Sequence, residues 1–326
     1  KIAETEQLLK QVIEAEEAGS GTIPKRYCTT DPEARMMKGN QGKQWYYNVI
    51  SSVDGAHALI SDIEATSSPT DHGELQPAMI RLRDRMEIRP GVQLGDAGFG
   101  PLQSIIDLIE GKIEGLPPIR CFVPIGNLQG QFDLQHGNRF VYHPEQDHYT
   151  CVAGEILALK QKDKQTKGTK ANVYQAKACP ACERKPICTP KSKIGRTVIR
   201  YVNQTTRDAY RELMKTKEAQ HMRRLRMSLS EHPFATLKLW MGKTPLTLRG
   251  RAKVNTQIAI FATAYNILRS SHIKSTQEMI QKVKEFDWSK TIDQLANPKN
   301  LGLLLQKIRR FFIPDLYSLV DRLILA

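Results

Sequence analysis

The stretch that decides the fold is WYYNVISSVDGAHALISDIEA, residues 45–65. Two β-rich runs, Trp45–Val53 and Ala56–Ala65, flank Asp54-Gly55, and this dipeptide is a strong short-range signal for a β-hairpin. An antiparallel hairpin that is followed by alternating helices and strands is not a regular βαβ repeat. The sequence therefore predicts an α/β fold with a mixed sheet.

The segments after the hairpin extend this prediction. A helix capped by Thr70 or Asp71 is expected to end at Met86, because apolar residues recur at helical spacing along it. A short strand over Val92–Gly95, a helix near residues 102–113 and a strand near residues 119–125 follow. The order β-β-α-β-α-β indicates a core that begins at about residue 31 and reaches residue 126.

Residues 127–200 interrupt this pattern and look like an insertion, since they lack helical periodicity and are rich in Lys, Gly and Pro. Helices are predicted again over residues 205–229, after Pro233 and over residues 253–269, so that residues 201–272 would complete the core. The last of these helices is apolar on several sides and is expected to be buried. Residues 1–30 predict a helical linker, and residues 273–326 a C-terminal helical tail.

Charge is distributed unevenly along the 326 residues, whose formal net charge is +14. Residues 1–120 carry 13 Lys and Arg against 18 Asp and Glu, a net −5, so residues 121–326 carry +19. A basic segment joined to an acidic one suggests that one part binds a polyanion, most commonly nucleic acid, while the other holds cations. The alternative is that the basic faces are merely solvated.

The sequence has no run of about 18 uncharged apolar residues and no signal-peptide pattern at its start. A soluble, cytoplasmic protein with no membrane contact is expected.

Two carboxylates are candidates for chemistry. Asp96 follows the predicted strand over Val92–Gly95, and Gly98 beside it leaves room for an ion or a phosphate, although Asp96 could instead cap the following turn. Glu231 lies at the predicted junction of two helices, close to a basic cluster of Arg223, Arg224 and Arg226. It would either form an ordinary salt bridge or bind a catalytic metal while the arginines hold phosphates.

Three of the six cysteines crowd into Cys179-x2-Cys182-x5-Cys188, and Cys151 precedes them. Four thiolates suit a tetrahedral Zn²⁺ ion that would stabilise the polar insertion. An iron–sulfur cluster and reduced, unliganded thiols remain alternatives. The His residues show no ligand spacing, so none is assigned to a metal.

The segment Lys160–Arg200 carries a high density of Lys and Arg with few acids, which is typical of sequence-independent contact with phosphates. A solvated loop is the alternative. Within and beyond this segment, the residues predicted to bind DNA are Lys191, Lys193, Arg196, Arg223, Arg224 and Arg226.

An ordered series of short motifs points to a family. It consists of Asp31-Pro32-Glu33-Ala34-Arg35-Met36-Met37, Tyr47-Asn48-Val49, Val53-Asp54, Asp71 with Leu75, Asp96-Ala97-Gly98, Glu231-His232-Pro233-Phe234, Arg249-Gly250, Lys253-Val254 and Ala264-Tyr265-Asn266. Over residues 30–269 this series resembles the C-terminal catalytic part of a DDE transposase from a bacterial insertion sequence.

The resemblance implies a ribonuclease H-like core in which three acidic residues hold two divalent ions, Mg²⁺ or Mn²⁺, for in-line attack on a phosphodiester. Asp96 and Glu231 match the second and third acids. No strand matching the first one appears in residues 1–30, so we expect the first catalytic Asp to lie upstream of a truncated chain rather than to be Asp31 or Asp54.

The resemblance also implies what the protein contacts. Its partners would be DNA, as transposon ends and target, and a second copy in a homodimer at the bacterial nucleoid. The alternative function is a catalytically inactive, transposase-derived protein that binds DNA or zinc.

Overall fold

The computed structural model describes residues 26–39, 42–125, 140–166, 169–241 and 246–285, with six helical positions between Glu6 and Glu14. Most of the predicted N-terminal linker and of the predicted C-terminal tail lies outside the described residues. Within the described part of the chain, no helix is both long and apolar enough to cross a membrane.

The described elements form a mixed α/β fold, as predicted. The strands are β1 (Arg35–Gly39), β2 (Gly42–Tyr46), β3 (Asn48–Val53), β4 (Ile60–Thr66), β5 (Val92–Leu94), β6 (Arg120–Phe122), β7 (Phe140–His143), β8 (His148–Cys151), β9 (Ile156–Thr166), β10 (Thr169–Gln175) and β11 (Thr197–Tyr201). The helices are α2 (Leu75–Met86), η1 (Ala97–Phe99), α3 (Leu102–Ile109), η4 (Cys179–Ala181), α4 (Lys185–Cys188), α5 (Gln204–Leu213), α6 (Lys217–Met241), α7 (Arg251–Ser271) and α8 (Thr276–Glu285).

The predicted hairpin is present as the antiparallel pair β3 and β4, whose register runs from Asn48 opposite Thr66 to Val53 opposite Ile60. The connection is longer than a two-residue turn, because the chain loops from Asp54 to Leu59. The Asp54 carboxylate holds this loop by accepting hydrogen bonds from the backbone N–H groups of Ala56, His57 and Leu59. The first predicted run also divides at Tyr47, since β2 pairs with β1 instead.

Helix α7 lies along β4 and satisfies backbone groups of that strand. Asn266 accepts a hydrogen bond from the N–H of Ile60 and donates one to its carbonyl, at 2.9 and 2.8 Å. Asn255, three turns earlier on the helix, accepts one from the N–H of Ala65 at 2.6 Å. Two amide side chains on one helix thus supply partners that a further strand would otherwise provide.

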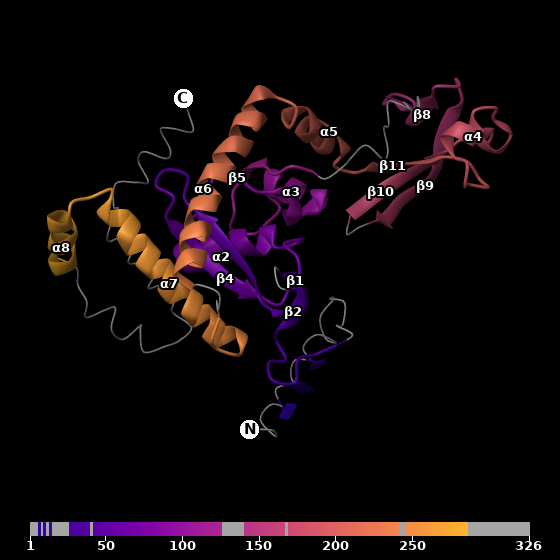
Figure 1. The fold of residues 1–326 in the computed structure, drawn as a ribbon. Coiled ribbons are helices and arrows are strands. Elements are labelled where there is room, and N and C mark those ends of the chain that lie inside the picture. Colours follow the sequence, from indigo (N-terminus) through magenta and orange to yellow (C-terminus); the bar gives the residue numbers. More distant parts are fainter. Residues whose placement is uncertain are drawn as a thin grey trace.

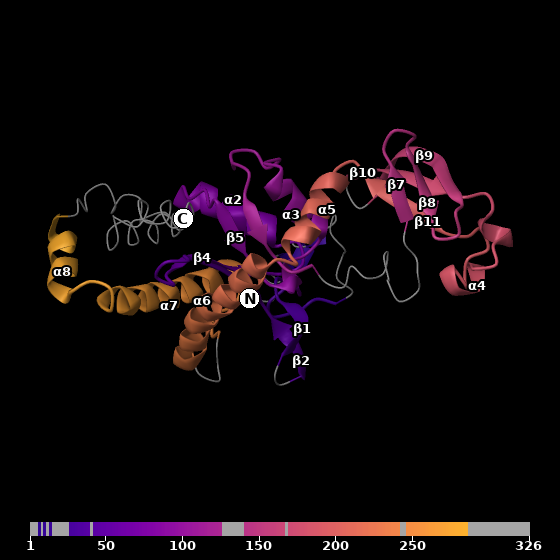
Figure 2. The same ribbon diagram turned by 90° about the horizontal axis from the view of Figure 1, so that it is seen from above.

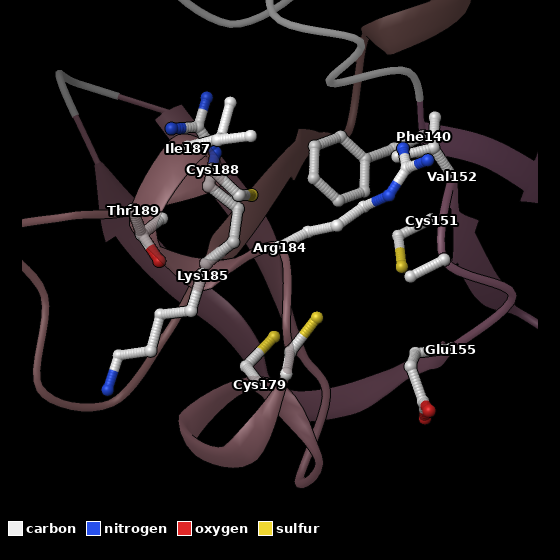
Figure 3. Close-up of a pocket in the computed structure, with 13 residues that line it drawn as sticks. Phe140, Cys151, Val152, Glu155, Cys179, Arg184, Lys185, Ile187, Cys188 and Thr189 are labelled. Atoms are coloured by element: carbon white, nitrogen blue, oxygen red, sulfur yellow. The ribbon is translucent and has the colours of Figure 1, made fainter.

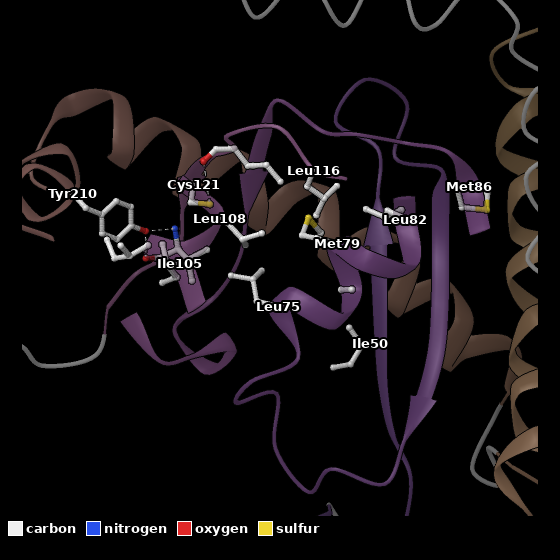
Figure 4. Packing of buried hydrophobic residues seen from close by; sticks show 14 of the residues in the cluster. Ile50, Leu75, Met79, Leu82, Met86, Ile105, Leu108, Leu116, Cys121 and Tyr210 are labelled. Atoms are coloured by element: carbon white, nitrogen blue, oxygen red, sulfur yellow. Dashed lines mark hydrogen bonds between the residues drawn. The ribbon is translucent and has the colours of Figure 1, made fainter. Parts of the chain in front are cut away.

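Two hydrophobic clusters stabilise the α/β core, defined here as β3 to β6 with α2, α3, α5, α6 and α7. The larger cluster joins α2 and α3 to β6 and includes fully buried Met79, Ile105, Ile106, Leu108 and Ile119 (Figure 4). The smaller cluster packs α7 against β4 through residues that include Ile60, Ala65, Val254 and Ile258. Tyr210 of α5 donates to the Val123 carbonyl at 2.7 Å and so ties α5 to the end of strand β6.

Strands β5 and β6 form a parallel pair, with Val92 opposite Arg120 and Leu94 opposite Phe122. Among the described strands, this pair and the β3–β4 pair are two separate hydrogen-bonded sheets. The α/β core therefore contains one antiparallel and one parallel pair, but among the described residues these pairs do not form the single mixed sheet that the sequence predicts. Packing of α2 and α3 joins them instead.

The predicted insertion is a regular structure rather than an irregular loop. Strands β7 to β11 form one antiparallel meander in the order β11-β10-β9-β8-β7, which we call the sheet unit (residues 140–201). It stands apart from the α/β core in both views (Figures 1 and 2). A small cluster of Tyr149, Leu157, Tyr174, Ala176 and Val198 forms its buried interior.

Several helix predictions are corrected. The break expected before Pro233 instead occurs after α5, and α6 continues through Pro233 in its interior. The cap of α2 is Glu74 without a side-chain hydrogen bond, not Thr70 or Asp71. Helix α7 is buried on one face only, because Ile260 and Leu268 are 62% and 46% exposed. Strand β4 covers one side of this helix, and the hydrophobic residues on its other side are exposed to solvent.

Candidate functional site

Asp96 lies directly after β5, where the sequence predicts it, and it does cap the following turn. Its Oδ1 accepts a hydrogen bond from the N–H of Gly98 at 2.8 Å. The other carboxylate oxygen, Oδ2, points to Arg226 of α6 at 3.7 Å, and the Asp96 side chain is 44% exposed. One oxygen therefore fixes the carboxylate on the turn while the second remains accessible for a charged partner.

Asp71 lies beside Asp96, and sequence reasoning gave it no chemical role. A methyl group placed on Gly98 would lie 2.9 Å from Oδ1 of Asp96 and 3.4 Å from Oδ2 of Asp71. The two carboxylates thus border the small space that Gly98 leaves open. Asn48 of β3 donates to Oδ1 of Asp71 at 2.7 Å and orients it. The ordered motif series contains both Asn48 and Asp71, which was the available signal.

Glu231 lies on α6, the helix that also contacts β5 and β6. Its side chain is exposed, and no described residue forms a hydrogen bond or ion pair with its carboxylate. Arg226, which reaches Asp96, precedes it by five residues, equivalent to about 7.5 Å along the helix axis. At 3.6 residues per turn, five residues also turn the side chain by about 140° about the axis, so Glu231 and Arg226 lie on different faces of α6. The pairing of the Asp96 and Glu231 carboxylates remains a prediction.

The two substitutes for a first acid are engaged in structural hydrogen bonds. Asp31 is 9% exposed and accepts from the Tyr47 hydroxyl at 2.6 Å and from the N–H of Gly250 at 3.1 Å. Burial and the bond to Asp31 raise the pKa of Tyr47 well above its usual range, so this hydroxyl stays a donor. The Asp54 carboxylate accepts three hydrogen bonds from backbone N–H groups of the loop that follows β3. Both carboxylates serve the fold, and the position of the first acid stays a prediction.

Four cysteines line one cavity of about 370 Å³ at the end of the sheet unit (Figure 3). Cys151 ends β8, Cys179 begins the turn η4 and Cys182 follows it, and Cys188 ends α4. Burial raises the pKa of the Cys188 thiol and nearby Arg196 opposes this, while the other three thiols raise it further. The predicted set of four residues is therefore brought together at one place.

The thiols surround the cavity without meeting at a point. Within the described residues, no group of three or more His, Cys, Asp or Glu side chains has an arrangement that holds a metal. The same holds for the acids around Asp96. Convergence of the four cysteines is thus a property of the fold, whereas metal binding at either place remains a prediction.

The arginines and lysines predicted to bind DNA divide into two groups. Lys191, Lys193, Arg223 and Arg224 are exposed to solvent. Arg226 instead forms the ion pair with Asp96, and Arg196 lines the cysteine cavity. Strand β9 also presents basic side chains, since Lys160, Lys162 and Lys164 are all exposed on it.

Comparison with known proteins gives one match. The family model of the transposase DDE domain matches residues 150–270, from β8 to α7. This segment is less than half of the chain; it contains Glu231 and the four cysteines but not Asp96. The resemblance to DDE transposases is confirmed by this match. No curated protein and no solved structure matches the chain.

Proposed function

We propose that this protein is a transposase whose α/β core cleaves and joins DNA strands with divalent metal ions, using Asp96 and Glu231. The single observation that carries the proposal is that α6, inside the segment matched by the transposase DDE domain, contacts Asp96 at the end of β5 through Arg226. The same helix also carries Glu231, the acid that the family pattern places third.

The environment of Asp96 fits a divalent ion. Carboxylate oxygens are the ligands that Mg²⁺ and Mn²⁺ prefer, and Asp71 and Asp96 both border the space beside Gly98. Bound ions would supply activation of a water or 3′-hydroxyl and stabilisation of the leaving oxygen. Arg226 neutralises Asp96 at 3.7 Å, and we expect it to turn to a phosphate when a metal ion takes its place.

Nicking of supercoiled plasmid in Mn²⁺ tests the proposal without knowledge of the transposon ends. We expect nicking when the chain is extended by the upstream strand that the resemblance assigns to the first acid, and we expect Asp96→Asn and Glu231→Gln in that protein to abolish it, because each change removes a metal ligand while keeping the side-chain shape. Glu212→Gln is the matched control, since Glu212 is also an exposed helical glutamate, 72% exposed on α5. It should nick at the wild-type rate.

Iron-directed backbone cleavage gives a second measurement that needs no DNA. Fe²⁺ bound in place of Mg²⁺ should cut the chain near Asp96 and near Glu231, and excess Mg²⁺ should suppress both cuts. If the protein that carries the first acid neither nicks plasmid nor shows these cuts, the result would instead support the alternative, an inactive transposase-derived protein that binds DNA or zinc.

We further propose that the exposed lysines of β9 bind the DNA backbone. Replacing Lys160, Lys162 and Lys164 by Gln should make the plot of log affinity against log salt shallower, by about 0.9 for each phosphate that these lysines neutralise. The charge-matched control replaces Lys38, Lys43 and Lys112, which lie in the acidic N-terminal third. If both triple variants change the slope equally, β9 is not the DNA-binding surface.

A further inference from the structure

The sheet unit contains a cluster of thiols that the proposed strand-transfer site does not use. Cys151, Cys179, Cys182 and Cys188 come from three separate segments and line one cavity (Figure 3). All four are partly exposed, unlike Cys121, which is fully buried in the α/β core. Unliganded structural cysteines favour the interior, so partial exposure of four clustered thiols needs a different explanation.

Local backbone structure directs these thiols to the same cavity. Cys179 and Cys182 are three residues apart across the 3₁₀ turn η4, in which residues i and i+3 lie on one face. The N–H of Cys182 donates to the Cys179 carbonyl, and the N–H of Lys185 donates to the Cys182 carbonyl at 3.0 Å. These turns carry the chain directly from the first pair to α4, whose last residue is Cys188.

Gly195 permits the close approach of the segment that holds Cys179. Its φ of +86° favours glycine, and a Cβ at this position would overlap Cβ of Cys179. Any larger residue must therefore displace Cys179. On the opposite side, Cys151 begins a tight turn in which the N–H of Gly154 donates to its carbonyl at 2.9 Å.

The chemistry of the cavity favours a soft, tetrahedral cation. Four thiolates are typical ligands of a structural Zn²⁺ ion, and such a site carries a net charge of about −2. Arg184, Lys185 and Arg196 line the same cavity and offset this charge. We propose that Cys151, Cys179, Cys182 and Cys188 bind one Zn²⁺ ion that joins η4 and α4 to the end of β8.

The size of the sheet unit gives such an ion a structural role. Its buried interior consists of a few side chains around Tyr149, Leu157 and Tyr174. Units below about 70 residues seldom obtain enough stability from one small hydrophobic core, and a metal is a common additional constraint. The ion would draw the thiols from the cavity wall to one point and fix a segment that holds no buried residue in η4 or α4.

Metal content of the full chain tests this proposal independently of any nuclease activity. We expect about one zinc ion per purified chain by plasma mass spectrometry, and the absorption of a four-thiolate Co²⁺ complex after exchange. Cys179→Ser and Cys188→Ser should each lose most of the metal. Cys28→Ser is the matched control, because Cys28 is also partly exposed but does not line the cysteine cavity, and its thiol forms a hydrogen bond with Thr30.

Alkylation of the wild-type chain avoids the risk that a variant fails to fold. Iodoacetamide should label the four cysteines only after a chelator is added, whereas Cys28 should be labelled at the same rate with and without it. Iron with acid-labile sulfide, a disulfide within the set, or chelator-independent labelling of all four thiols would each overturn the proposal.

Discussion

The α/β core and the sheet unit are stabilised by different interactions. The α/β core buries two hydrophobic clusters between helices and short strands, and its acidic residues Asp31 and Asp54 are consumed by hydrogen bonds of the fold. The sheet unit buries a small, tyrosine-rich cluster and relies on Arg200, whose guanidinium lies 3.7 Å from the centre of the Tyr142 ring. Burial of hydrophobic side chains is therefore the main stabilising interaction in the α/β core. Contacts between arginine and tyrosine side chains are the main one in the sheet unit.

The two regions also differ in the charge that they present. In the α/β core, Asp71 and Asp96 meet near Gly98. In the sheet unit, one long strand, β9, exposes almost all of its side chains and carries lysines. We infer that the region with the larger hydrophobic core supports the acidic site, while the smaller region is free to present positive charge.

The largest expected effect is a cavity in the α/β core. Ile106→Ala removes a side chain that is 0% exposed, so we expect the free energy of unfolding to fall by about 2–5 kcal/mol. Native-state hydrogen exchange should report this change in peptides from residues 48–125 and much less in residues 140–201. Ile187→Ala, at a residue that is 64% exposed, should change neither region. An equal drop in protection in both regions would show that they unfold as one unit.

The fold of the α/β core was largely predictable because its signals are local. Asp54-Gly55 marked the β3–β4 hairpin, and helical periodicity marked α2 and α7. The break between α5 and α6 was not predictable in this way, since Pro233 indicates a helix start from sequence but lies inside α6, where tertiary packing of a buried proline tolerates it. The sheet unit was missed because β9 lacks the alternation of buried and exposed residues that identifies a strand.

A second prediction weakens the sheet unit alone. Arg200 stacks on Tyr142 and donates to the Tyr149 hydroxyl at 3.4 Å, so Arg200→Gln should cost about 1–2 kcal/mol of local stability in residues 140–201. Arg211→Gln is the control, because it removes only a surface pair with Asp208 and should cost less than about 1 kcal/mol. If Arg200→Gln leaves exchange in the sheet unit unchanged, polar aromatic contacts do not stabilise it.

The candidate site was predictable only in part. Asp96 could be selected from sequence because it follows a predicted strand, and the four cysteines could be selected because of their spacing. The position of Asp71 beside Asp96 depends on how η1 folds back toward residue 73, where the N–H of Gly73 donates to the Phe99 carbonyl. The inward direction of Arg226 depends on the packing of α6 across β5. Contacts of this kind join residues far apart in sequence and leave no local pattern.

The smallest expected effect concerns acid stability of the sheet unit. Asp147 accepts hydrogen bonds from the hydroxyls of Tyr174 and Tyr142, at 2.5 and 2.8 Å, and the bond from Tyr174 is the main cause that lowers the pKa of Asp147. Because the pKa is lower in the folded state than in the unfolded state, Asp147 contributes stability above the unfolded pKa of about 4. This contribution disappears as the pH falls through the folded pKa.

Asp147→Asn should therefore destabilise residues 140–201 by about 1 kcal/mol at neutral pH, and the difference from the wild-type chain should shrink below about pH 4. Exchange measured on the two proteins at neutral and acid pH provides the comparison. Glu145→Gln, at an exposed residue two positions earlier, is the control and should follow the wild-type chain at every pH. A difference between Asp147→Asn and the wild-type chain that persists unchanged in acid would mean that the asparagine disturbs packing, and that the charge of Asp147 does not stabilise the tyrosine cluster.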